Sequence, residues 1–226
     1  MKKVFFRFFA LGLIAAGVIF ILNAGLPILR YELFQAPRFK KAELLSPVSQ
    51  RGIVMSATQG SPDLTKASNW FEDTRNVEVE LPRVRFYTLS IPKLGIRDAV
   101  AEIGGEDLSK GLVHYKGTAL PGKIGNSVIF GHSILPQFFD PKNYLSIFST
   151  LPRLEKGDKI IIDYDGITYT YEVQSMFETQ PDDLAVLGQD TDGVYISLIT
   201  CVPPGTYLRR LVVKAKLLPQ AKLVPT

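Results

Sequence analysis

The sequence predicts an all-β domain, a closed barrel or a sandwich with only short helices, preceded by one N-terminal transmembrane helix. Three observations support this fold class. An uncharged apolar run covers residues 8–29, a mixed polar stretch follows it, and seven or eight short apolar runs separated by turn residues fill residues 83–217. Short strands at such spacing, without long helices between them, are typical of closed barrels and sandwiches.

The first element is the run from Phe8 to Leu29, which holds 22 residues and no charge. A helix of that length, at about 1.5 Å per residue, crosses roughly 30 Å of hydrocarbon. The alternative is a cleaved signal peptide, because Lys2 and Lys3 provide a positively charged start. The run is long for a signal peptide and no clear A-x-A site follows, so we expect an uncleaved anchor after a cytoplasmic segment at residues 1–7. Basic residues flank the run on both sides, so charge alone does not fix the orientation.

The net charge of +4 does not indicate a nucleic-acid-binding protein. Residues 1–41 contain seven Lys or Arg and one Glu, which gives +6, whereas the remaining 185 residues contain nineteen basic and twenty-one acidic residues, which gives −2. The excess of positive charge therefore belongs to the N-terminal end. A body without a basic surface has little to bind phosphates with, so we expect no nucleic-acid partner.

Residues 30–82 predict a stalk or linker, with a short helix near "KAELL" and with Trp70 and Phe71 docking onto the domain. In the domain, Asp165-Gly166 lies between two β-branched runs and predicts a tight hairpin. Residues 218–226 are expected to be a C-terminal tail. The other predicted strands lie in "VRFYTLSI", "GLVHY", "NSVIFGHS", "VYISLIT" and "RLVVKAKL".

The single cysteine, Cys201, ends one of these strands. Side chains alternate along a strand, which puts Cys201 on the opposite side from the more apolar face of Ile196 and Leu198. The same alternation puts Arg210, in the next strand, on that non-core side. If the two strands pair as a hairpin, the guanidinium favours a thiolate or binds a developing oxyanion. A lone cysteine is commonly an inert buried residue, and the residues alone leave both interpretations open.

A nucleophilic thiol needs a proton partner, for which histidine is best suited near neutral pH. His132 follows "NSVIFG" at a strand end, where side chains commonly reach solvent and substrate. His114, inside "GLVHYKGT", is the weaker candidate. The sequence contains no HxxxH or CxxC motif, no cluster of acids and no glycine-rich phosphate loop, so we expect no metal site and no cofactor.

Three segments resemble the sortase family. "LITC" followed by "RRLVV" is similar to the sortase signature, in which a strand ends in the cysteine and an arginine lies on the next strand. "GLVHYKGTALPGKIGNSVIFGHS" resembles the segment leading to the family's histidine, and "LSIPKLGI" resembles the strand that opens its domain. The resemblance covers residues 83–217, with the three motifs in the family's order.

The resemblance implies an eight-stranded β-barrel on the outer side of the cell membrane, held by a single span. It implies that Cys201 attacks an LPxTG-like sorting signal and forms a thioacyl enzyme, that His132 transfers the protons, and that Arg210 holds the oxyanion or the substrate. Thr200 would contact substrate, and His114 would be structural. The implied partners are surface proteins with a C-terminal sorting signal, and an amine from the cell wall or from another protein. No cofactor is implied, and activation by calcium stays open.

One departure is that Ser197 stands four residues before the cysteine, where the family often has threonine. The sequence has no aspartate-proline-aromatic lid motif before the domain and no second span after it, which argues against a pilin-polymerising member. Two alternatives remain. One is a cysteine endopeptidase that passes the acyl group to water and releases surface proteins, and the other is a non-enzymatic anchored β-barrel that binds a surface partner.

Overall fold

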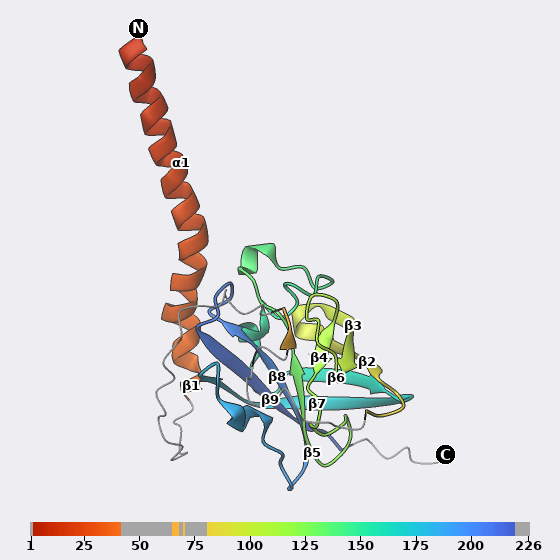
Figure 1. Ribbon diagram of the computed structural model, residues 1–226. Helices are drawn as coiled ribbons and strands as arrows, with labels where there is room; N and C mark the ends of the chain where they lie inside the picture. Colours follow the sequence, from red (N-terminus) through yellow and green to blue (C-terminus); the bar gives the residue numbers. More distant parts are fainter. Residues whose placement is uncertain (1, 42–64, 68–69, 71–80, 220–226) are drawn as a thin grey trace, which may run out of the picture.

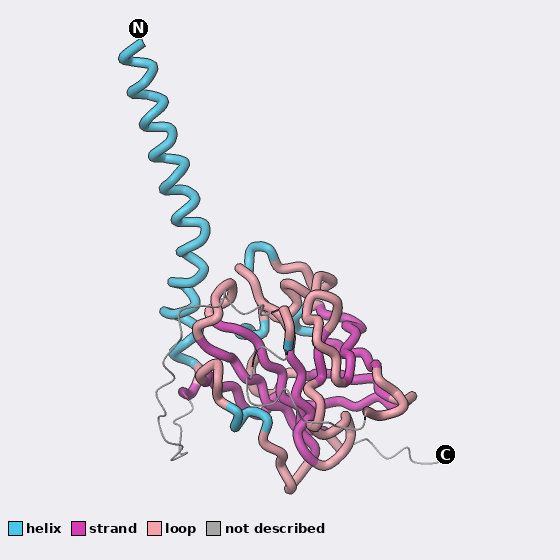
Figure 2. Tube along the Cα trace, viewed as in Figure 1, coloured by secondary structure: helices cyan, strands magenta, loops and turns pink. Residues whose placement is uncertain are grey.

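A long N-terminal helix stands beside a β-barrel in this computed structural model, which describes residues 2–41, 65–67, 70 and 81–219 (Figure 1). The helix is α1 (Lys2–Arg30), and it is followed by a helical turn at Tyr31–Gln35 and a 3₁₀ turn at Ala36–Arg38. Outside α1 the described helical elements are short, and strands make up most of the body (Figure 2). The strands are β1 (Lys40–Lys41), β2 (Phe86–Ile91), β3 (Ile96–Ile103), β4 (Leu112–His114), β5 (Gly125–Phe130), β6 (Lys159–Tyr164), β7 (Ile167–Thr179), β8 (Val194–Val202) and β9 (Arg209–Leu217).

Strands β2 to β9 close into an eight-stranded barrel. Their order is β7-β6-β2-β3-β4-β5-β8-β9, and β9 pairs back onto β7. Closure leaves no free barrel edge for pairing with another chain. The two residues of β1 pair in parallel with β7 as an added strand. The predicted fold class, a closed eight-stranded barrel preceded by one apolar helix, is confirmed.

The predicted hairpin at Asp165-Gly166 is also confirmed. These two residues join β6 to β7, and both have positive φ, 51° for Asp165 and 75° for Gly166. A two-residue turn with positive φ at both positions matches the twist of the flanking strands, and Asp-Gly adopts it at little cost. The sequence therefore encodes this connection locally.

Apolar side chains fill the barrel and also cover one patch of its outer wall. The interior cluster includes Leu89, Ile162, Leu198 and Val213. A second cluster lies on the opposite face of β5, β8 and β9, and its members are Ala67, Trp70, Leu108, Val113, Tyr115, Val128, Phe130, Val186, Ile199, Cys201 and Val212. The expectation that Cys201 lies on a face away from any core was therefore wrong. Alternation correctly separated the two faces of β8, but both are buried.

The segment predicted as a stalk packs on the barrel wherever it is described. Tyr31 and Phe39 belong to the interior cluster, and Trp70 is almost fully buried. The predicted docking of Trp70 is thus confirmed, whereas Phe71 and residues 42–45 of the predicted short helix lie outside the described residues. Residues 31–41 therefore join α1 to the barrel through packed side chains.

Candidate active site

Cys201 and Arg210 face each other across the β8–β9 hairpin. They are direct cross-strand partners in the antiparallel register. The Nη1 atom of Arg210 donates a hydrogen bond to the Sγ atom of Cys201 over 3.3 Å. This is the juxtaposition that strand alternation predicted.

Trp70 covers this pair. The Arg210 guanidinium carbon lies 4.5 Å from the centre of the Trp70 ring, a cation–π arrangement. Trp70 also meets Phe130 edge-on, with ring centres 5.2 Å apart. Ala67 packs in the same cluster as Cys201, and its carbonyl accepts a hydrogen bond from the Trp70 N–H. As a result, only 1% of Cys201 and 3% of Arg210 is exposed.

The site is electrostatically unusual because it buries a cation without a carboxylate. Among the described residues, the ion pairs do not include Arg210. Burial lowers the pKa of Arg210, and raises the pKa of the Cys201 thiol to about 11 against the opposing attraction of Arg210. The covered site therefore holds a protonated thiol next to a guanidinium with unused hydrogen-bonding capacity.

His132 lies at the end of β5, the parallel neighbour of β8. The ring centres of His132 and Trp70 are 6.4 Å apart, so His132 borders the same cover. Gly131 lets the backbone pass close to Phe148, because a Cβ atom at this position would lie 2.4 Å from the Phe148 ring. The next residue, Ser133, donates its hydroxyl to the Cys201 carbonyl over 2.6 Å. The segment that carries His132 is thereby fixed against the strand that carries the thiol.

Thr200 precedes Cys201 on β8 and makes a hydrogen bond within the barrel. Its side chain is fully buried on the opposite face of β8 from Cys201, and its hydroxyl donates to the Gly131 carbonyl over 2.8 Å. Contact of Thr200 with substrate stays a prediction. Thr200 joins the ends of β5 and β8, which supports the residues on either side of it.

His114 lies apart from the thiol in a closed hydrogen-bonded setting. Its Nδ1 atom is 3.0 Å from the Tyr87 hydroxyl, and its Nε2 atom is 3.1 Å from the Thr118 hydroxyl. Burial lowers the pKa of His114 to about 4, so the ring is neutral at pH 7. Both ring nitrogens are occupied by these contacts, and the arrangement agrees with a structural role.

Arg209, the neighbour of Arg210, points to the other side of β9. Its Nε atom lies 2.7 Å from Glu178, its Nη2 atom lies 2.5 Å from Glu32, and Tyr31 also donates a hydrogen bond to Glu178. Glu178 is buried, so these contacts compensate its charge. This group, the junction network, connects the strand of the candidate site to the end of α1, and no local pattern in the sequence indicated it.

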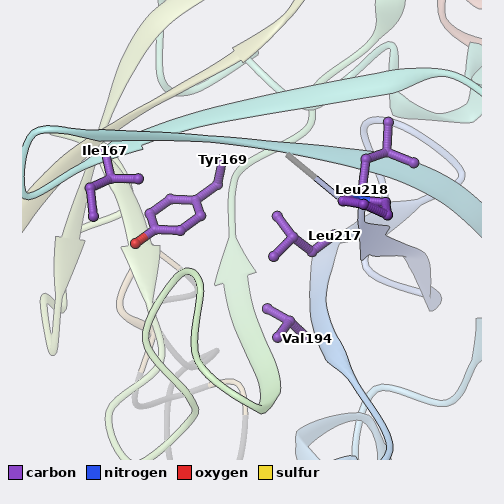
Figure 3. Close-up of a pocket in the computed structure, with 6 residues that line it drawn as sticks. Ile167, Tyr169, Val194, Leu217 and Leu218 are labelled. Atoms are coloured by element: carbon purple, nitrogen blue, oxygen red, sulfur yellow. The ribbon is translucent and has the colours of Figure 1, made fainter. Parts of the chain in front are cut away.

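An open apolar pocket of about 470 Å³ lies elsewhere on the barrel (Figure 3). Val194 begins β8 and Leu217 ends β9, so the pocket is at the opposite end of this strand pair from Cys201 and Arg210. Its lining residues are Ile167, Tyr169, Val194, Leu217, Leu218 and Pro219. The pocket lacks groups that could take part in acyl transfer, and it is not the candidate site.

No group of three or more His, Cys, Asp or Glu residues suited to a metal ion occurs in the part of the chain that the structure describes. The arrangement at Cys201 can supply a sulfur nucleophile, a nearby histidine and a fixed guanidinium. These are the parts needed for acyl transfer through a thioester.

Comparison with known proteins gives one consistent result. The family profile described as "Sortase domain" matches residues 89–218. The chain is 26% identical to sortase D of Bacillus subtilis over 204 residues, which cover 90% of both chains, and 31% identical to sortase A of Bacillus anthracis over 69% of this chain and 67% of the relative. Among solved structures, sortase A of Corynebacterium diphtheriae superimposes with a TM-score of 0.53 at 31% identity, covering 65% of each chain.

Proposed function

The chain belongs to the sortase family, whose members are cysteine transpeptidases that attach proteins to the cell wall, and we propose that it cleaves an LPxTG-like sorting signal through a thioacyl enzyme on Cys201. The observation that carries the proposal is the 3.3 Å contact between the Cys201 sulfur and the Arg210 guanidinium. A cation fixed beside a thiol stabilises both the thiolate and an adjacent oxyanion.

The proposed reaction needs four proton transfers, and His132 serves all of them. Cys201 gives its proton to His132, and the sulfur bonds to the carbonyl carbon of the Thr–Gly peptide bond while Arg210 stabilises the negative oxygen. The C–N bond breaks, and the leaving amine takes the proton from His132. The acceptor amine then attacks the thioester and gives a proton to His132, and this proton returns to the departing thiolate.

The proposed acceptor is an amine of the cell wall or of another protein, and the proposed donors are surface proteins with a C-terminal sorting signal. The reaction uses only side-chain and peptide groups, so we propose that it requires no cofactor. Unchanged turnover after treatment with a chelator would support this, and a loss restored by calcium would contradict it.

We further propose that α1 is a single-pass anchor and that the barrel lies outside the cell. Sortases are cell-surface enzymes, and the described helices include one that is long and apolar enough to cross a membrane. Its apolar side chains, such as Ile19 and Phe20, are exposed in the structure and have no protein surface to cover them. Lipid is the environment that such a helix requires.

The test is mass spectrometry of the protein after incubation with a library of LPxTG-like peptides. An acyl adduct on Cys201 identifies both the nucleophile and the motif, and Cys201→Ala is the matched control. Adding an amine nucleophile distinguishes the main alternative, a cysteine endopeptidase. A transpeptidase forms the amide product, whereas an endopeptidase gives only the free acid.

A further inference from the structure

We propose that the two loops that border the candidate site enter the headgroup region of the membrane, so that the site faces the lipid surface. These loops, here called the rim loops, are residues 133–142 after His132 and residues 203–208 after Cys201. The inference rests on the proposed anchoring by α1.

The first observation is a direct contact between a rim loop and the anchor. The Nε2 atom of Gln137 donates to both the backbone carbonyl and the side-chain oxygen of Asn23, over 3.1 and 3.2 Å. Asn23 lies six residues before Leu29, the end of the proposed span, so about 9 Å of helix separates the contact from that end. The contact with Asn23 is therefore on the bilayer side of Leu29. A loop that makes this contact lies at the level of the headgroups or deeper while residues 8–29 span the membrane.

The second observation is that the rim loops carry exposed apolar side chains. Phe138 is 62% exposed, Tyr207 55% and Leu208 64%. Single exposed apolar residues are ordinary on protein surfaces. These three are distinguished by their place, because they lie on two loops beside the anchor. Aromatic and aliphatic side chains with a nearby tyrosine hydroxyl suit the boundary between headgroups and acyl chains.

The two rim loops form one surface. Gly205 lies against Leu135, since a Cβ atom built on Gly205 would be 2.9 Å from the Leu135 side chain. Figure 1 shows the loop after β5 and the loop between β8 and β9 at the end of the barrel next to the lower part of α1. A single apolar surface that touches the anchor is more favourably placed for lipid than for a soluble partner.

The barrel is also held firmly at this angle to the helix. The junction network connects Arg209, at the end of one rim loop, to Glu32, which follows α1. Leu33 and Phe34, in the same turn, are exposed as well, and Arg30 adds a positive charge that anionic headgroups attract. Contacts at both Asn23 and Glu32 keep the rim loops on the membrane side.

The experiment measures the depth of single fluorescent labels in the full-length chain. Cys201→Ala removes the only cysteine, and Phe138→Cys, Leu208→Cys, Ile124→Cys and Phe20→Cys are then made one at a time and labelled with an environment-sensitive dye. The proteins are reconstituted in vesicles of phosphatidylcholine with a minor share of phosphatidylglycerol, with or without a nitroxide on the upper acyl chain. Ile124 is the matched control, because it is exposed and apolar but precedes β5, at the opposite end of that strand from the rim loop. Thermal unfolding confirms that each labelled chain is folded.

We expect the dyes at positions 138 and 208 to emit at shorter wavelength in vesicles and to lose emission when nitroxide lipid is present. The dye at position 124 should show neither change. Position 20 reports on the anchor alone. A loss at position 20 with no loss at 138 and 208 would overturn this inference and leave the anchoring intact. No loss at position 20 would show that the anchoring proposal itself is wrong. A blue shift at 138 and 208 without quenching by lipid would mean that protein covers the rim loops, and would also overturn the inference.

Discussion

Arg210 and Arg209 lie on opposite faces of the β8–β9 hairpin, and their charges have opposite surroundings. On one face, Arg210 is buried beside Cys201 and beneath Trp70, with no ion pair among those of the described residues. On the other face, its neighbour Arg209 is held by Glu178 and Glu32. The first cation keeps its charge available for a reacting group, whereas the second is already neutralised.

This difference separates reactivity from stability. A guanidinium that already binds carboxylates has few donors free for an oxyanion. Its removal leaves those carboxylates without a cation, and a buried one is then destabilising. A buried guanidinium without a carboxylate costs stability and is preorganised for a negative group. We therefore expect changes on the Cys201 face to alter chemistry, and changes on the Arg209 face to alter stability.

The largest expected effect is that of Cys201→Ala. We expect complete loss of thioacyl formation and transpeptidation, because the sulfur is the proposed nucleophile. Alanine removes only one heavy atom from the second cluster, so the free energy of unfolding should fall by about 1 kcal/mol at most. Mass spectrometry of the acyl enzyme and thermal unfolding measure the two quantities. Retained turnover with a large loss of stability would make Cys201 a structural residue.

The next effect is that of Arg210→Lys. Lysine keeps the charge but replaces a planar fork of donors by a point charge. Loss of one oxyanion donor typically lowers the rate on the order of a hundredfold or more. Single-turnover acylation should therefore slow by about that factor, with peptide binding changed less. An unchanged acylation rate would mean that the guanidinium geometry is unimportant.

The matched change on the other face is Arg209→Ala. It removes the cation beside buried Glu178, but Tyr31 still donates a hydrogen bond to that carboxylate. Loss of a partner from a fully buried pair costs about 3 to 5 kcal/mol, so we expect a smaller loss of about 2 kcal/mol in the free energy of unfolding. Acylation should change by only a small factor. The comparison between the two faces fails if Arg209→Ala slows acylation more than Arg210→Lys does.

The last change, Trp70→Ala, is expected to alter the reactivity of the thiol without removing a catalytic group. Removing the indole exposes Cys201 to water, and the pKa of its thiol should fall from about 11 towards the ordinary value of 9.0. Each unit of this fall raises the thiolate fraction below the pKa roughly tenfold. The pH profile of alkylation by iodoacetamide measures the shift. An unchanged profile would show that Trp70 does not control access to the thiol.

Much of the candidate site could be predicted because it depends on local patterns. The period of two in β8 and β9 placed Cys201 and Arg210 on one face and Arg209 on the other. The sequence could not place Trp70 over them, because no local period connects residue 70 to residue 210. The one tryptophan in this polar segment indicated that the segment docks onto the barrel, but it did not indicate which part of the barrel it contacts. Thr200 was likewise expected near substrate, and only the parallel pairing of β5 with β8 showed that its hydroxyl meets Gly131.

By itself, the sequence determined the apolar helix, the Asp165-Gly166 turn, the alternation of the strands and, through three motifs, the family. These features depend on residues that are close together in the chain, where chirality, side-chain direction and turn geometry act directly. Only the tertiary structure decided what covers each face. It placed Trp70 on Arg210, joined Arg209 to Glu32 and Glu178, and brought Gln137 beside Asn23. Such contacts follow from closure of the barrel and from the burial of apolar surface, which depend on the whole chain at once.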